Sequence, residues 1–310
     1  MSTHKLDESA SGVYIISATP FDDSGAVDLD SADRLVDFYI EKGVSGITIL
    51  GMMGEAQKMS PDESESFLAR VMRRVDGRLP VVVGVSNAGL DNLVRLSKAS
   101  MDQGAAGVMV APLAGLGTEQ KIYNYFCQVF EALGPGIPVC YQDYPFATRS
   151  EISVPLFNRM VAEFDQLVML KHEECPGLGK ISAVRQASDD GLRRVSILCG
   201  NGGLYLPQEL ARGADGAMTG FAYPEMLVDV VALHLAGDQD KAEDLFDAYL
   251  PLVRHEQQPG FGLALRKEVL YRRGVIASPK VRAPGPTLTT TDKDELSRII
   301  IRVQKNAEAL

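Results

Sequence analysis

Short apolar runs alternate with amphipathic segments along most of the chain. Each run has the length of a strand and carries apolar residues at consecutive positions, which is typical of a parallel strand covered on both faces. The runs predict strands at residues 13–17, 46–50, 80–85, 107–110, 137–141, 167–171, 195–199 and 216–219. Helical spacing in the segments between and after them predicts helices at 31–42, 61–75, 90–103, 118–133, 154–163, 178–187, 204–212 and 224–235.

The regular alternation of strands and helices predicts an α/β fold, a (β/α)₈ TIM barrel over residues 12–236. A doubly wound sheet is the alternative, but it would bring a G-x-G-x-x-G motif after an early strand, and the sequence has none. A polar tail at 1–11 precedes the barrel. Residues 237–310 form a C-terminal extension that we expect to pack on the barrel and to help shape a subunit contact. Its three helices are predicted at 239–255, 262–273 and 291–307.

The amino-acid composition limits the kinds of molecule that the chain is expected to bind. The formal net charge of −10, with no basic block, argues against a nucleic-acid or anionic-membrane surface and favours a small-molecule substrate. No apolar run is long enough for a membrane span, and the first residues lack a hydrophobic signal core, so we expect a cytoplasmic protein. The four cysteines and four histidines have no metal-ligand spacing, so we expect neither a metal nor a cofactor.

The apolar run at 167–170 ends abruptly in Lys171, which places an amine at the carboxyl end of a strand. In a (β/α)₈ barrel these strand ends form the mouth where chemistry occurs. Burial disfavours the ammonium form, and a neutral amine can attack a ketone to form a Schiff base. The alternative is a structural ion pair with Glu173 or Glu174.

Other unusual residues fall at the ends of predicted strands and point at the same mouth. Thr19 follows the first strand, and the loop Gly51-Met52-Met53-Gly54 follows the second. Two glycines let backbone N–H groups face inward, which suits a small carboxylate, although an ordinary tight turn has the same composition. Tyr141 ends the fifth strand, where its phenol could carry protons or could simply pack at the barrel rim.

Together these residues resemble the dihydrodipicolinate synthase / N-acetylneuraminate lyase family of class I aldolases. The motifs that carry the resemblance are Thr19-Pro20-Phe21, the Gly-x-x-Gly-Glu loop from Gly51 to Glu55, Tyr141, Lys171, Gly200 and Gly213-Ala214-Asp215-Gly216. The resemblance implies a lyase that holds pyruvate or another 2-keto acid as an imine on Lys171 and joins it to, or cleaves it from, an aldehyde, or dehydrates it. It also implies that the Gly51-to-Gly54 loop binds the carboxylate, that Tyr141 relays protons, and that the chain forms a homotetramer or homodimer. Arg149, Gly200 and Met218 complete the substrate-binding residues that it implies.

The sequence also departs from the family pattern. Met52 and Met53 stand where synthases usually have two threonines, and Leu113-Ala114 stands where the loop after the fourth strand usually supplies a second tyrosine. Arg149 comes later than the arginine of the family. The second-substrate half of the pocket should therefore be more apolar, unless Tyr144, Asp143 or His172 intrudes, and a partner other than aspartate semialdehyde is expected.

Two other functions stay open at the level of sequence. The glycine-rich run at 200–203 could bind a phosphate, as loops after the seventh strand do in many barrels, which would indicate a phosphosugar aldolase. A family member that binds a keto acid without turnover is the non-enzymatic alternative. His172 follows Lys171 directly, so strand alternation should point it away from the mouth.

Overall fold

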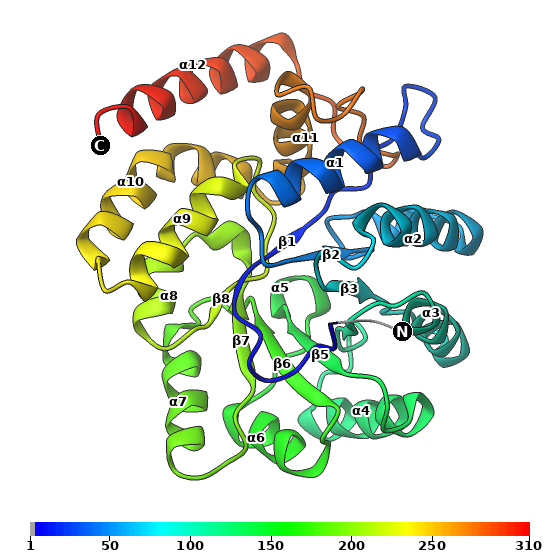
Figure 1. Cartoon of the computed structure of the whole chain (residues 1–310). Coiled ribbons are helices and arrows are strands. Elements are labelled where there is room, and N and C mark those ends of the chain that lie inside the picture. Colours follow the sequence, from blue (N-terminus) through cyan, green and yellow to red (C-terminus); the bar gives the residue numbers. More distant parts are fainter. Residues whose placement is uncertain (1–3) are drawn as a thin grey trace.

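The computed structural model describes residues 4–310 and shows a closed barrel of eight parallel strands in the order β1 to β8 (Figure 1). The first three residues of the predicted tail lie outside the described residues. The predicted (β/α)₈ barrel is confirmed. Its strands are β1 (Gly12–Ile16), β2 (Gly46–Ile49), β3 (Val81–Gly84), β4 (Gly107–Val110), β5 (Val139–Asp143), β6 (Leu167–His172), β7 (Ser196–Cys199) and β8 (Gly216–Ala217).

Helices surround the barrel as the amphipathic pattern predicts. They are α1 (Leu29–Glu41), α2 (Pro61–Val75), α3 (Leu90–Asp102), α4 (Glu119–Leu133), α6 (Val154–Glu163), α7 (Leu178–Asp189), α8 (Leu206–Ala211) and α9 (Pro224–Leu235). Ser60 caps α2 in a full capping box with Glu63, and Pro61 takes the first helical position, where its missing N–H costs nothing.

Three local predictions are wrong, all near the mouth. Strand β5 continues to Asp143, where a loop was predicted from residue 142, and the rest of that loop contains the short helix α5 (Pro145–Thr148). The 3₁₀ helix η2 (Asn201–Gly203) precedes α8, which begins later than predicted. Strand β8 spans only Gly216–Ala217, although backbone hydrogen bonds to its neighbours continue from Met218 N–H to Cys199 O and from Ile16 N–H to Thr219 O. These places are rich in glycines and turn residues, so the hydrophobic pattern does not reveal the residue at which strand pairing stops.

The strands bury two separate apolar layers. Side chains such as Ile16, Met109, Cys140, Met169 and Met218 fill the barrel interior. A larger cluster lies between the strands and the surrounding helices. Because successive side chains of a strand point to opposite faces, the layer that each residue occupies is decided by its parity along the strand.

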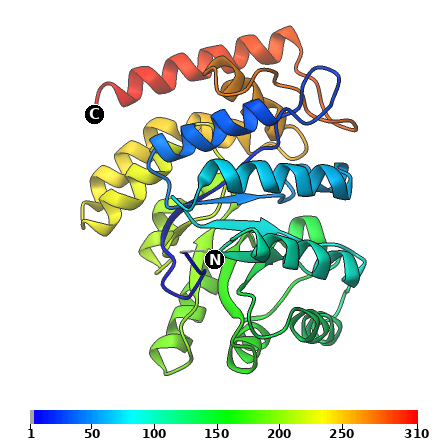
Figure 2. The ribbon, with the colours of Figure 1, turned by 45° about the vertical axis from the view of Figure 1, so that its right-hand side comes forward.

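The C-terminal segment forms α10 (Gln239–Glu256), α11 (Gly262–Arg272) and α12 (Thr290–Ala307), close to the predicted bounds. Figures 1 and 2 show α10 beside α9 and α12 crossing the outside of this group. The stretch after α11 returns to α1, where the backbone N–H of Ala277 donates to Ser31 Oγ at 3.0 Å. No helix within residues 4–310 combines the length and the apolar character needed to cross a membrane.

Helix α8 carries one carboxyl group that is buried without a full set of hydrogen-bond partners. Glu209 is almost fully buried, and its Oε2 atom has no hydrogen-bond partner. Burial raises the pKa of Glu209 to about 7, and the nearby His172 only partly opposes this effect. The folded chain therefore holds the Glu209 proton more tightly than the unfolded chain does.

Glu209→Gln should change how stability depends on pH. Between pH 4.5 and about 7 the folded wild type binds more protons than the unfolded chain, so ionisation of Glu209 lowers wild-type stability as the pH rises. The variant lacks this loss and should exceed the wild type by roughly 1–3 kcal/mol at pH 8, with a smaller difference at pH 5. Urea midpoints at both pH values measure it, with Glu243→Gln on the exposed face of α10 as the control. An equal wild-type-to-variant difference at the two pH values would contradict this prediction.

Candidate active site

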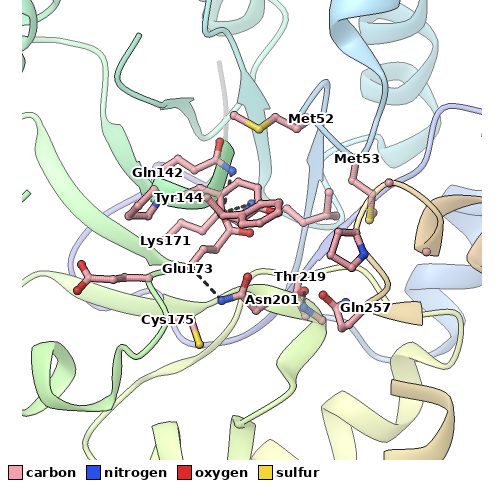
Figure 3. A pocket seen from close by; sticks show the side chains of 18 of the residues that line it. Met52, Met53, Gln142, Tyr144, Lys171, Glu173, Cys175, Asn201, Thr219 and Gln257 are labelled. Carbon is pink, nitrogen blue, oxygen red and sulfur yellow. Dashed lines mark hydrogen bonds and ion pairs between the residues drawn. The ribbon is translucent and has the colours of Figure 1, made fainter. Parts of the chain in front are cut away.

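A cavity of about 1450 Å³ opens at the carboxyl ends of the barrel strands. It is larger than the pocket that a three-carbon acid requires, so it has room for a longer substrate or a second one. Among the predicted site residues, Lys171, Met52, Met53 and Arg149 line it. The C-terminal segment contributes Glu256, Gln257 and Arg266, which the sequence did not single out. Figure 3 shows Lys171 near Gln142, Tyr144 and Glu173, with Met53, Thr219 and Gln257 on the other side.

Lys171 is the last residue of β6 whose side chain points into the barrel. Met169, two residues earlier, belongs to the interior layer, so the same parity brings the Lys171 side chain to the cavity floor. Its Nζ atom lies 3.1 Å from Glu173 Oε2, and the lysine is almost fully buried. The ion pair that was the alternative interpretation is present. It lies inside the cavity, so it also places an acid/base group next to a possible nucleophile.

Glu173 is held in place by three neighbouring segments. Its backbone N–H donates to Asp143 O at 2.9 Å, and Gln142 Nε2 donates to its Oε2 at 2.8 Å. Asn201 Nδ2 donates to the backbone carbonyl of Glu173 at 3.0 Å. A Cβ atom at Gly200 would lie 2.2 Å from Glu173 Cγ, so this position must be glycine for the carboxylate to lie where it does.

The predicted position of Tyr141 is wrong. Gln142 is the residue of β5 that pairs with Lys171, and it faces the cavity, so Tyr141 faces outward. The Tyr141 ring packs between α4 and α6, with its centroid 4.8 Å from that of Phe126 and 6.0 Å from that of Phe157. Its hydroxyl is buried without a partner, and burial raises the pKa of Tyr141 well above its usual value. The packed aromatic that was the alternative is the observed arrangement.

Tyr144 is the phenol that lines the cavity instead. It lies just beyond β5, is partly buried, and stands near Lys171 in Figure 3. Burial, together with the charge of Glu173, raises the pKa of Tyr144, so its hydroxyl stays protonated at neutral pH and can donate a proton.

The loop after β2 presents unused backbone donors. The hydrogen bonds of the described residues leave the N–H groups of Met52, Met53 and Gly54 without an acceptor. Thr19 lies behind the loop rather than in the cavity, and its hydroxyl donates to Gly54 O at 2.6 Å. Glu55 closes the loop in the left-handed region, with φ of 56°, and forms a buried ion pair with Lys267 at 2.6 Å. The loop is therefore fixed from behind while its donors stay free.

The remaining predicted residues lie at or outside the edge of the cavity. Arg149 is exposed at the rim with its guanidinium 5.6 Å from the centroid of the Phe146 ring. Met218 fills the barrel interior beside Cys140, and neither Met218 nor Gly200 lines the cavity. His172 points away from the mouth, as predicted, and is buried with Nδ1 3.6 Å from Asp143 Oδ2. Within residues 4–310, no group of three His, Cys, Asp or Glu side chains is close enough to hold a metal ion.

Comparison with known proteins gives consistent matches over nearly the whole chain. The model of the dihydrodipicolinate synthetase family matches residues 9–303. The L-2-keto-3-deoxyarabonate dehydratase of Azospirillum brasilense is 30% identical over 94% of this chain and 94% of its own. The 4-hydroxy-tetrahydrodipicolinate synthase of Persephonella marina is 26% identical over 93% and 97% of the two chains. Among solved structures, a dihydrodipicolinate synthase from Rhodopseudomonas palustris has 47% identity and a TM-score of 0.95, over 97% of this chain and 100% of the other.

Replacing Tyr141 or Tyr144 with phenylalanine should show which of the two phenols acts in the cavity. Tyr141→Phe removes a buried hydroxyl that has no partner, so turnover should stay within about twofold of wild type and stability should not fall. Tyr144→Phe removes the cavity phenol and should lower kcat by about 10-fold or more. Steady-state kinetics on a 2-keto acid substrate and thermal unfolding test both variants. A larger kinetic loss in Tyr141→Phe than in Tyr144→Phe would contradict the assignment.

Gly200→Ala should displace the Glu173 carboxylate. The added methyl would overlap the Glu173 side chain. The backbone at Gly200, with φ of −99° and ψ of −136°, also lies outside the regions that alanine prefers, which adds to the displacement. We expect kcat to fall by about 10-fold or more, because the carboxylate would leave its position beside Lys171. Gly179→Ala on α7, where an added methyl meets open space, is the matched control and should keep wild-type kinetics. Unchanged kinetics in Gly200→Ala would show that the position of Glu173 is not important for turnover.

Proposed function

The chain belongs to the dihydrodipicolinate synthetase family, whose members are class I aldolase lyases, and we propose that it dehydrates a 2-keto-3-deoxy acid bound as an imine on Lys171. The observation that carries the proposal is the Glu173 carboxylate 3.1 Å from Lys171 Nζ, inside the cavity. A base at this position can reach the carbon next to the imine, which is the carbon that must lose a proton in a dehydration.

Imine formation uses the ion pair directly. Glu173 takes a proton from the Lys171 ammonium, and the neutral amine attacks carbon 2 of the keto acid. The carbonyl oxygen takes one proton from the attacking amine and one from Glu173 and leaves as water, which restores the Glu173 carboxylate. The product is a protonated C=N bond that withdraws electrons from carbon 3. The substrate carboxylate is held by the free N–H groups of Met52 and Met53, the two loop residues that line the cavity.

Loss of water then follows from the acidified carbon 3. The Glu173 carboxylate removes a proton from carbon 3, and the electron pair of that bond forms the enamine. The enamine expels the hydroxyl group of carbon 4, which takes up one proton from Glu173 or Tyr144 and leaves as water. A C=C bond between carbons 3 and 4 remains. Hydrolysis of the imine releases the unsaturated keto acid and restores Lys171.

The composition of the cavity favours dehydration over the condensation that makes dihydrodipicolinate. Methionines replace the loop hydroxyls, Tyr141 faces away from the cavity, and Gln142 occupies the inward position on β5 beside Lys171. A carboxylate just after β6, Glu173, takes the place of a relay of hydroxyl groups. The similarity to a keto-deoxy-acid dehydratase over 94% of the chain supports the same conclusion. The similarity to the Rhodopseudomonas palustris synthase keeps condensation as the second candidate function.

Borohydride added with pyruvate should inactivate the protein and leave one covalent adduct per chain, on the peptide that contains Lys171. Lys171→Ala should abolish this trapping. Glu173→Gln should still be trapped, but its kcat for dehydration of a 2-keto-3-deoxypentonate should fall by about 10²–10⁴-fold, the usual range for a general acid/base. Peptide mass spectrometry and an assay for the keto product measure these outcomes. An adduct on another lysine, or full activity in Glu173→Gln, would contradict the mechanism.

A coupled assay with pyruvate and aspartate semialdehyde separates the candidate functions. We expect synthase activity far below the dehydratase activity. The family's loop hydroxyl is replaced at Met52 and its second tyrosine is missing at Leu113-Ala114, and the effects of the two losses partly combine. A synthase kcat in the ordinary enzyme range of about 1–10³ s⁻¹ would favour condensation. Trapping of pyruvate without turnover of either substrate would indicate a keto-acid-binding protein, and inhibition by phosphate without a pyruvate adduct would indicate a phosphosugar aldolase.

A further inference from the structure

Arg266 is a buried cation on the cavity wall that the proposed dehydration does not use. It lies on α11, is only 5% exposed, and lines the cavity. Its Nε atom donates to Glu256 Oε2 at 2.7 Å, and its Nη1 atom contacts the sulfur of Met53. Glu256 is the last residue of α10, so the ion pair joins two helices of the C-terminal segment at the edge of the cavity.

Some of the N–H donors of Arg266 have no acceptor. A guanidinium has five N–H donors, and the hydrogen bonds of the described residues use two of them, one of which goes to a thioether, a weak acceptor. The Nη2 atom has no partner, and it is not among the fully buried polar atoms of the described residues that lack one, so its donors are open to the cavity that Arg266 lines. The free donors therefore point to an oxygen atom of a bound molecule.

The surrounding residues place this site on the side of the cavity opposite the reacting groups. Met53 lies on that side in Figure 3, together with Gln257 and Thr219, across from Lys171 and Glu173. A Cβ atom at Gly220 would lie 2.8 Å from Arg266 Nη1 and 2.2 Å from Met53 Cε. Glycine at this position, just after β8, allows the guanidinium to approach the cavity.

The local charges decide which oxygen-bearing group fits. Glu256 already balances the Arg266 charge at 2.7 Å, just as Lys171 and Lys180 are paired with Glu173 and Glu174. A second carboxylate at Arg266 would compete with Glu256 for the same cation, whereas a neutral hydroxyl needs only the free N–H donors. We propose that Arg266 determines specificity by binding the hydroxyl-bearing end of the keto acid, remote from the imine carbon. This inference rests on the proposed function, because it assumes a 2-keto acid held at Lys171.

Isothermal titration calorimetry with four ligands tests the proposal, since it measures binding whether or not an imine forms. Pyruvate lacks the remote end, and three five-carbon acids differ only at carbon 5: 5-hydroxy-2-oxopentanoate, 2-oxopentanoate and 2-oxoglutarate. Corrected for its open-chain fraction, the hydroxy acid should bind the wild type about 10-fold or more tightly than either of the others. Equal or tighter binding of 2-oxoglutarate would overturn the choice of a hydroxyl over a carboxylate.

Two variants then assign the effect to the guanidinium. Arg266→Met should weaken binding of the hydroxy acid by about 10-fold or more while pyruvate stays within about twofold. The double variant Glu256→Gln with Arg266→Met also lacks the guanidinium but leaves no lone buried charge, so it answers the question if the single variant does not fold. Arg272→Met is the matched control on α11, because its guanidinium bonds Glu268 and does not line the cavity.

The outcomes separate the inference from the proposed function. An equal loss for pyruvate and the hydroxy acid would place Arg266 at the carboxylate of the substrate and overturn the inference. Unchanged affinity for the hydroxy acid in both variants would overturn it as well. Failure of borohydride to trap pyruvate on Lys171 would instead reject the imine, and the titrations would still show whether Arg266 binds the remote hydroxyl.

Discussion

The contact between Lys171 and Glu173 depends on the pairing of β6 with both of its neighbours. Pairing with β5 places Gln142 beside Lys171, and the Asp143 carbonyl accepts the N–H of Glu173. On the other side, Gly200 at the end of β7 leaves the volume that the Glu173 side chain fills. A lysine at a strand end becomes a candidate nucleophile here because three consecutive strands hold one carboxylate against it.

The sequence predicted the barrel and the position of Lys171 at its mouth, but not which residues of the neighbouring strand β5 face inward. Apolar runs and helical periodicity are repeated many times along the chain, so small errors in bounds do not change the fold. The direction of Tyr141 depends instead on which residue of β5 lies beside Lys171, and a shift of one residue moves a side chain from the cavity to the outer layer. That register is set by pairing between strands and leaves no local signal. The prediction for His172 succeeded because it required only alternation within β6.

Long-range ion pairs explain why the C-terminal contribution to the cavity could not be predicted. Glu55, at the end of the loop that presents the free N–H donors, pairs with Lys267, 212 positions later in the chain. Burial lowers the pKa of Lys267 to about 8, although the Glu55 carboxylate opposes this effect. Neither residue lines the cavity, yet together they fix α11 against the loop, and α11 carries Arg266 to the wall. Charged residues in an amphipathic helix usually face solvent, so only the folded contact distinguishes these two.

The two ion pairs in the cavity give it an unusual distribution of charge. Lys171 with Glu173 and Arg266 with Glu256 are each close to neutral as pairs, so neither attracts an anion strongly over a long distance. Inside the rim, where Arg149 lies, the uncommitted positive potential is at the loop, where three N–H groups have no acceptor. A keto acid with one carboxylate therefore has one favourable orientation, with its charged end at the loop, carbon 2 at Lys171 and its neutral end toward Arg266. A dicarboxylate would gain no second site of this kind at Arg266, so the same two ion pairs that prepare the chemistry also favour a neutral group at that end of the substrate.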